Sequence, residues 1–116
     1  MLEAADRRER GGAVINVSSQ MGHVGSAGRT VYCTTKHALE GMTKAMAVEF
    51  APWNIRVNAI SPGGTKTNIL SSFSTYPEGA DLRQLVKVMS PMEMAEPEEI
   101  AALFAFIASQ IGRAHV

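Results

Sequence analysis

Two short apolar runs, separated by a longer amphipathic segment, dominate the pattern of hydrophobic and polar positions along the chain. Residues 13–17 (AVINV) and 55–60 (IRVNAI) are rich in β-branched residues and end in polar or glycine-containing turns. Such runs are typical of buried parallel strands. Between them an apolar stripe recurs at spacings of three and four residues, formed by Leu39, Met42, Met46 and Phe50. The stripe predicts a helix that Thr30 caps and that ends at about Phe50.

Glycine and proline residues mark where these elements begin and end. Residues 2–10 are predicted to be the last turns of a helix, which the glycine pair at 11–12 ends. Pro52 and Asn54 break the long helix, and the sequence at 61–64 (SPGG) stops the second strand. A Ser- and Gly-rich loop is therefore expected at residues 18–29, between the first strand and the long helix.

The second half of the chain is predicted to contain a loop and two helices. Residues 65–80 are polar and aperiodic, which indicates a flexible loop or lid, and residues 81–89 suit a short helix. Pro97 opens a final helix, because proline is favoured in a first helical turn. The acidic residues Glu96, Glu98 and Glu99 lie at the positive end of that helix.

The order of these elements predicts an α/β fold with parallel strands. Two strands do not complete a doubly wound sheet, since a parallel strand is stable when neighbours and helices cover it on all sides. We therefore expect a partial Rossmann-like, doubly wound parallel sheet, with residues 1–109 forming part of a larger domain.

Composition and charge narrow the classes of function. The 11 basic and 11 acidic residues cancel, so charge offers no argument for a nucleic-acid or membrane partner. A single cysteine, Cys33, builds neither an internal disulfide nor a metal cage. The start of the chain is charged, and the longest apolar run, at residues 100–108, is shorter than the roughly 20 residues that span a bilayer. These features predict a cytoplasmic protein without a metal site.

Tyr32 and Lys36 are the first candidates for chemistry. They lie four residues apart, so a helix presents both on one face. A free phenol loses its proton only near pH 10, but a neighbouring ammonium favours the phenolate and makes tyrosine a usable acid or base. Taken alone, the pair also fits two residues that share a helix face by chance.

Polar residues that follow the two strands give this pair its context. Ser19 comes directly after the first strand, and Pro62 and Gly63 come after the second, with Thr65 and Thr67 close behind. Ligands of open α/β sheets bind at the carboxyl ends of the strands, so these residues are expected at one edge of the sheet.

The ordered combination of these motifs resembles the short-chain dehydrogenase/reductase family. The resemblance rests on residues 15–19 (INVSS), Gly22, the Tyr32-x-x-x-Lys36 motif, residues 55–63 (IRVNAISPG) with Thr67, and residues 96–101 (EPEEIA). It runs from about residue 2 to Ser109. It implies a Rossmann-like fold and an NAD(P)-dependent oxidoreductase that interconverts an alcohol and a ketone by hydride transfer.

The resemblance also implies a role for each candidate residue. Tyr32 would be the catalytic acid/base, Lys36 would favour its phenolate and bind the nicotinamide ribose, and Ser19 would polarise the substrate oxygen. The cofactor, NAD or NADP, would be held by Tyr32 and Lys36 and by residues of the loop after the second strand, namely Pro62, Gly63, Thr65 and Thr67. The partners implied are a small-molecule alcohol or ketone and further copies of the chain in a homodimer or homotetramer, through the helix at 30–50.

The chain departs from the family pattern at both ends. The glycine-rich G-x-G-x-x-G cofactor motif and the residue that selects NAD or NADP are not in the sequence. Residues 110–116 do not continue the pattern and are expected to be a non-native tail. The isolated chain is therefore expected to be an inactive fragment. The sequence of the loop at 65–80 does not identify a substrate, and sugar acids, small polyols, steroids and 3-oxoacyl thioesters all remain compatible with it.

Two other interpretations stay open. His23, in the glycine-containing loop, could face a substrate, whereas His37 is expected to pack on the helix surface. The small residues Ala38, Gly41 and Ala45 along one helix face would suit a cofactor-free interaction module derived from the same fold. An intact Ser-Tyr-Lys set has no use in such a module, which favours the enzyme.

Overall fold

The computed structural model describes residues 11–69, 78–79, 81, 83 and 93–109. The elements, in chain order, are β1 (Gly12–Val17), the 3-10 turn η1 (Gln20–Gly22), α2 (Thr30–Phe50), the 3-10 turn η2 (Ala51–Trp53), β2 (Ile55–Ile60) and α5 (Pro97–Ala108). The helix predicted at residues 2–10 and the tail at 110–116 lie outside the described residues, as does all of the predicted helix at 81–89 except Asp81 and Arg83.

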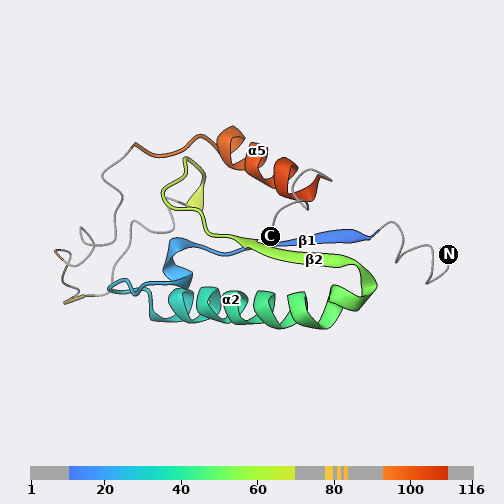
Figure 1. Cartoon of the computed structure of the whole chain (residues 1–116). Helices are drawn as coiled ribbons and strands as arrows, with labels where there is room; N and C mark the ends of the chain where they lie inside the picture. The colour runs from blue at the N-terminus through green and yellow to red at the C-terminus, as the bar shows by residue number, and fades with distance from the viewer. Residues whose placement is uncertain (1–10, 70–77, 80, 82, 84–92, 110–116) are drawn as a thin grey trace.

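The described elements form three layers (Figure 1). β1 and β2 pair in parallel, in a register that runs from Gly12 opposite Ile55 to Val17 opposite Ile60. Helix α2 covers one face of this two-stranded sheet, and α5 lies over the other face. Helices on both faces of a parallel sheet confirm the predicted α/β class.

The face that α2 turns toward the sheet is more polar than the sequence suggests. Thr43 is only 7% exposed, whereas Met42 of the predicted apolar stripe is 46% exposed. The Asn16 side chain in β1 donates to the Thr43 hydroxyl over 2.9 Å, and that hydroxyl donates to the Leu39 carbonyl over 2.7 Å. Of the predicted stripe, Leu39, Met46 and Phe50 are half-buried, whereas Met42 is exposed and the buried position next to it is taken by Thr43 with its hydrogen bond to β1.

The start of α2 also differs from the prediction by one residue. Thr30 is the first helical residue, and the cap position falls on Arg29, whose side chain makes no capping hydrogen bond. The turn before it contains Gly28 in the left-handed region, at φ 73°. This turn sets the entry of the chain into the helix, so the side-chain cap predicted from Thr30 is wrong.

A close contact between the turns that precede β1 and β2 aligns the first residues of the two strands. Asn54, at the C-terminal end of η2, adopts a left-handed φ of 58°, and its carbonyl accepts from the Gly12 amide over 3.1 Å. Gly11 has φ 71°, and a Cβ there would lie 2.6 Å from the Asn54 carbonyl oxygen. Glycine is thus required at position 11, and the predicted breaks at Pro52 and Asn54 are confirmed.

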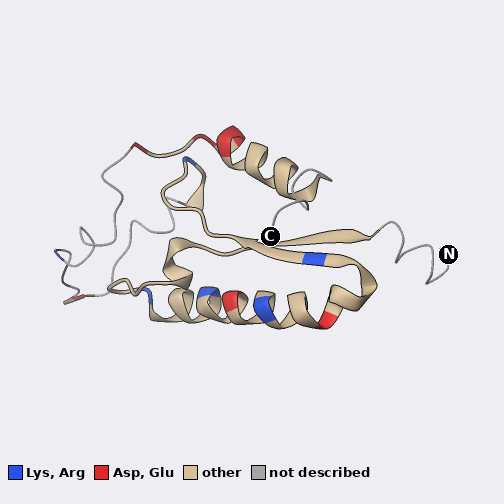
Figure 2. Ribbon diagram, viewed as in Figure 1, with Lys and Arg blue, Asp and Glu red and all other residues tan. Residues whose placement is uncertain are grey.

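Helix α5 is stabilised at both ends by charged side chains. The side chains of Glu96 and Glu99 form a capping box at its start, and acidic residues gather there (Figure 2). At its C-terminal end, the Arg56 guanidinium of β2 donates to the carbonyls of Ile107 and Ser109 over 2.8 and 3.2 Å. A positive group at that end complements the helix dipole and couples α5 to β2.

Main-chain hydrogen bonds join the loop after β2 to the segment before α5. Thr65 and Ala95 form a parallel bridge, in which Lys66 N donates to the Ala95 carbonyl over 3.0 Å. The Ala95 amide donates in turn to the Gly64 carbonyl over 2.9 Å. An ion pair between Lys66 and Glu96 lies beside this bridge. The two ends of the segment between these residues are thereby held together.

Candidate active site

A pocket of about 300 Å³ opens where β1 and β2 end. Seven residues singled out in the sequence all line it, namely Ser19, Tyr32, Lys36, Pro62, Gly63, Thr65 and Thr67. The carboxyl ends of parallel strands are where open α/β sheets bind ligands, because the loops diverge there. The structure therefore brings the predicted residues together at one edge of the sheet, as expected from their places in the sequence.

Ser19 is held in place by the turn that it begins. Its hydroxyl oxygen accepts from the Met21 amide over 3.1 Å, and the residue is 8% exposed. A serine hydroxyl has one proton and two lone pairs, so this contact leaves the proton available for a ligand oxygen at the pocket. The neighbouring Ser18 amide donates to the Ile60 carbonyl over 2.8 Å, which fixes the end of β1 to the end of β2.

Tyr32 and Lys36 lie on successive turns of α2. The Lys36 ammonium is 5.5 Å from the centre of the Tyr32 ring and donates to the Val17 carbonyl over 3.0 Å. The carbonyl at the end of β1 thus holds the positive charge beside the Tyr32 ring. An ammonium has three donors, so it can serve this carbonyl and a ligand together.

The loop after β2 completes the wall of the pocket. The Gln20 amide of η1 donates to the Pro62 carbonyl over 3.1 Å and links the two strand-end loops. The Thr65 hydroxyl donates to the Gly63 carbonyl over 3.3 Å, and Gly63 and Gly64 are exposed. The two glycines present no side chain of their own to a ligand, and the nearest side chains to a Cβ built on them are Gln20 beside Gly63 and Met94 beside Gly64.

A cluster of His23, Glu40 and Ser61 next to the pocket was not found from the sequence. The Ser61 hydroxyl donates to the Glu40 carboxylate over 2.9 Å, and His23 Nε2 lies 3.1 Å from Ser61 Oγ and 3.3 Å from Glu40 Oε1. His23 is not among the residues that line the pocket. The one signal in the sequence is spacing, because Tyr32, Lys36 and Glu40 follow one another at intervals of four.

The surroundings of Glu40 hold its carboxyl in the charged form. A hydrogen bond from the Ser18 hydroxyl has the largest effect and lowers the pKa of Glu40. Desolvation opposes it, while the Ser61 hydroxyl and electrostatic interactions with His23 and Lys44 reinforce it, so the pKa lies below its usual range. The Ser18 hydroxyl also lies 3.3 Å from the Lys36 carbonyl, but the carboxylate is the stronger acceptor for its single proton.

This lowered pKa predicts how the stability conferred by Glu40 depends on pH. Relative to a Glu40→Gln variant, the wild type is expected to gain stability above the usual glutamate pKa of about 4.3. The gain is expected to disappear as the pH falls through the lower pKa of the folded state, because the folded protein then also binds the proton. Urea unfolding of both proteins across acidic pH measures the difference in their free energies of unfolding. A difference that stays constant down to about pH 3 would contradict the prediction.

The other candidate side chains on α2 have structural partners. His37 Nδ1 lies 2.7 Å from the Cys33 carbonyl on the helix surface, and the Cys33 thiol is free and buried. Within the described ranges, no three histidine, cysteine or acidic side chains are grouped as metal ligands. Of the helices in the same ranges, none has the length and apolar character of a membrane span.

Comparisons with known proteins give the chain close relatives. A family model described as enoyl-(acyl carrier protein) reductase matches residues 1–114. The 3-oxoacyl-[acyl-carrier-protein] reductase FabG of Aquifex aeolicus is 35% identical over 105 residues, which cover 90% of this chain and 40% of that protein.

Solved structures have the same arrangement of elements. A short-chain type dehydrogenase/reductase from Mycobacterium marinum superposes with a TM-score of 0.74 at 32% identity, over 97% of this chain and 44% of that one. A 4-hydroxyisoleucine dehydrogenase complexed with NADH gives a TM-score of 0.69 at 31% identity, over 90% of this chain and 41% of that one. The chain thus spans about two fifths of the length of the proteins that it matches.

Proposed function

Because the chain belongs to the short-chain dehydrogenase/reductase family, we propose that it carries the active site of an NAD(P)-dependent oxidoreductase that interconverts an alcohol and a ketone. The observation that supports this most strongly is the pocket at the strand ends, because Ser19, Tyr32 and Lys36 all line this one cavity. The type of reaction and the class of substrate are inferred from relatives that are longer than this chain.

In the proposed reaction, Tyr32 and Ser19 act on the substrate oxygen. During reduction of a ketone, the carbonyl oxygen accepts hydrogen bonds from both hydroxyls, and the Tyr32 proton moves to it as the C–H bond forms. During oxidation, the Tyr32 phenolate takes the proton from the alcohol. The Lys36 ammonium stabilises that phenolate in both directions, because its charge lies 5.5 Å from the ring centre.

The residues around the pocket fit a nicotinamide cofactor. The group, when bound, supplies or accepts the hydride. Lys36 has donors for a ribose hydroxyl, and the exposed backbone of Gly63 and Gly64 allows close approach of a flat ring and its phosphate. Thr65 and Thr67 also line this wall and supply hydroxyl groups. Relatives whose structures hold NADH support the same class of cofactor.

Cofactor-dependent turnover tests the proposal directly. The protein that carries this chain is mixed with a panel of ketones, including cyclic ketones and 3-oxoacyl thioesters, and with either NADH or NADPH. We expect the absorbance of the reduced nicotinamide to fall with at least one ketone. Absence of turnover with every pair, in a folded protein that binds the cofactor, would contradict it.

We also propose that the 116 residues do not turn over substrate when isolated from other segments. In the described part of the chain each strand is paired along one edge, and the apolar side chains of Val17, Leu103 and Phe106 are exposed. A parallel strand in that state lacks the neighbours that normally stabilise it. Incubation of the purified chain with NADH and the same ketones, followed by the absorbance of the reduced nicotinamide, tests this; turnover would refute it.

Self-association through α2 is proposed on two grounds, the family resemblance and the exposure of one helix face. Ala38, Gly41 and Ala45 are exposed, and the space around Gly41 is open. Val48, on the same helix, is 78% exposed. Small residues allow two helices to approach closely, so Gly41→Arg is expected to convert a dimer or tetramer into smaller species. Sedimentation of the wild type as a monomer would contradict the proposal.

A further inference from the structure

We propose that Glu40 is a positioning residue, which ties the ends of both strands to α2 and so sets the distance between Ser19 and the Tyr32–Lys36 pair. The inference rests on the proposed function, since it concerns the geometry of the same site. Glu40 itself is not among the residues that line the pocket. It therefore acts through its neighbours and not on the substrate.

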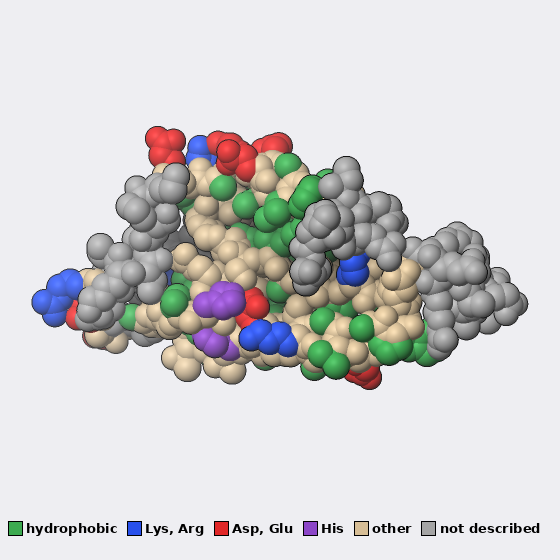
Figure 3. Space-filling view, viewed as in Figure 1, with side chains coloured by type: hydrophobic (Ala, Val, Ile, Leu, Met, Phe, Trp, Pro, Cys, Tyr) green, Lys and Arg blue, Asp and Glu red, His purple; other side chains and the backbone are tan. Residues whose placement is uncertain are grey.

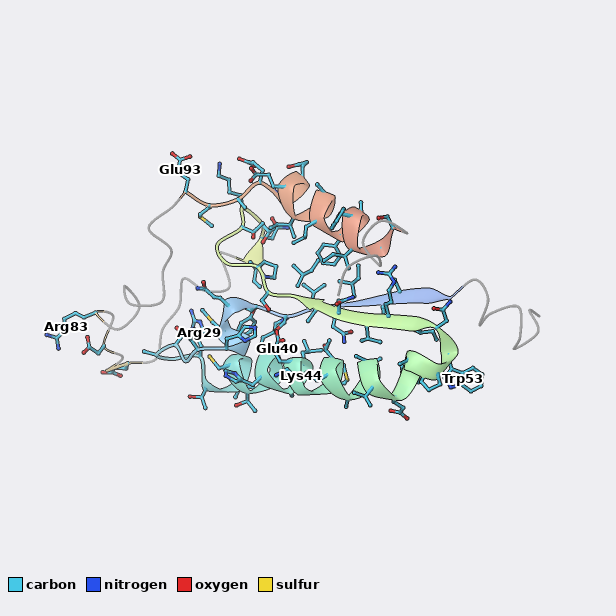
Figure 4. The ribbon with its side chains drawn as sticks, viewed as in Figure 1. Arg29, Glu40, Lys44, Trp53, Arg83 and Glu93 are labelled. Atoms are coloured by element: carbon cyan, nitrogen blue, oxygen red, sulfur yellow. The ribbon has the colours of Figure 1, made fainter. Side chains whose placement is uncertain are left out.

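The contacts of Glu40 reach each element that carries a site residue. Its side chain points from α2 toward the sheet (Figure 4) and is 15% exposed. Its carboxylate accepts from Ser61, the last residue before Pro62, over 2.9 Å. The hydroxyl of Ser18, the residue before Ser19, lies 3.3 Å from the Lys36 carbonyl, one turn before Glu40 on the same helix. Each of these contacts thus ties the immediate neighbour of a predicted site residue to α2.

The turn of α2 that carries Lys36 and Glu40 has little room to move. Glu40 follows Lys36 by one helical turn, so a displacement of its backbone also displaces Lys36. Gly22 of η1 packs directly against this turn. A Cβ at Gly22 would lie 2.6 Å from Ser18 Oγ and 3.0 Å from the Lys36 carbonyl oxygen. The glycine therefore lets η1, β1 and α2 meet at one point, and the carboxylate joins β2 to the same point.

The geometry favours positioning over a second catalytic centre. Figure 3 shows the two described histidines together on one face, beside acidic and basic side chains. In a nucleophilic triad the imidazole bridges the hydroxyl and the carboxylate with its two nitrogens. Here His23 Nε2 lies near both Ser61 and Glu40, and the Ser61 hydroxyl donates to the carboxylate itself. Ser61 is therefore hydrogen-bonded as a structural link and is not activated as a nucleophile.

Substitution of Glu40 in the protein that carries this chain tests the proposal. We expect Glu40→Ala to lower kcat per cofactor-binding site by roughly tenfold to a hundredfold, because small displacements of reacting groups are costly. Glu40→Gln keeps an oxygen that accepts from Ser61 and is expected to retain most of the activity. Glu49→Ala is the matched control, since Glu49 is an exposed glutamate on the same helix.

Measurement of kcat per folded active site distinguishes a positioning role of Glu40 from a role in stability alone. If Glu40 served stability alone, Glu40→Ala would lower the melting temperature and the number of folded sites but leave kcat per site unchanged, which would overturn the inference. Ser61→Ala removes the hydrogen bond to Glu40 and the contact with His23 but leaves the carboxylate in place, and it covers the case in which Glu40→Ala does not fold. It is expected to lower kcat several-fold, and wild-type turnover in it would also overturn the inference.

Parallel measurement of Tyr32→Phe distinguishes failure of this inference from failure of the proposed function. An inactive Tyr32→Phe variant together with a fully active Glu40→Ala variant contradicts only the role of Glu40. An active Tyr32→Phe variant contradicts the proposed function, on which the role of Glu40 depends.

Discussion

Replacing Tyr32 with phenylalanine in the protein that carries this chain is expected to lower kcat by about a thousandfold or more. The substitution removes one hydroxyl group and keeps the ring beside which the Lys36 ammonium lies. Packing and the cation–π contact are therefore retained, while the hydroxyl that we propose gives a proton to the substrate oxygen is lost. Steady-state kinetics with a saturating ketone and reduced cofactor measure the effect.

Two further measurements make this result interpretable. The melting temperature is expected to stay near that of the wild type, because the ring and its contact with the Lys36 ammonium are retained. Thr34→Ala serves as a control, since Thr34 is an exposed residue of the same helical turn whose hydroxyl donates to the Thr30 carbonyl. Turnover within a few-fold of the wild type in Tyr32→Phe would exclude the proposed acid/base role.

Lys36→Met is expected to have the second-largest effect, a loss of roughly a hundredfold in kcat at neutral pH. Methionine keeps much of the apolar stem but removes the charge that the Val17 carbonyl holds beside Tyr32. In the proposed mechanism that charge stabilises the negative charge that Tyr32 carries, so the pH profile for alcohol oxidation is expected to move toward higher pH without it. Rates measured across neutral and alkaline pH show both changes.

The charge and the hydrogen-bonding geometry of Lys36 can be separated by a second variant. Lys36→Arg keeps a positive group but replaces a compact ammonium with a planar guanidinium, so we expect partial recovery of the pH profile and a persistent loss of cofactor affinity. Lys44→Met, two turns farther along α2, is the matched control (Figure 4). An unshifted pH profile in Lys36→Met would show that Lys36 does not stabilise the phenolate.

Local sequence patterns predicted the elements that depend on neighbouring residues. The run at 55–60 became β2 with the same bounds, because β-branched residues lie between a turn at Asn54 and a Ser-Pro-Gly stop. Pro97 and the acidic residues around it predicted the start of α5 for the same reason. The burial of Thr43 on α2 was not predicted, since its partner is Asn16, far away in the chain.

Some features of the candidate site were also predictable from local sequence patterns, and others were not. Strand ends, a helix spacing of four and the family motifs were enough to gather the pocket residues, although their roles remain predictions. The link from Ser61 to Glu40 depends on how closely β2 approaches α2. The contact of Arg56 with the end of α5 depends on a crossing of elements more than fifty residues apart. Only three-dimensional distances reveal such contacts, because neither leaves a periodic pattern in the sequence.

The bridge between Thr65 and Ala95 has a consequence for how this protein family diversifies. Main-chain hydrogen bonds join the two ends of the intervening segment, and the entropy lost when the ends of a flexible segment are joined rises only with the logarithm of its length. Changes of length after Ile69 and before Glu93 therefore add little to the free-energy cost of folding. Evolution, or an engineer, can vary the part of the chain that follows the pocket while the pocket residues keep their places.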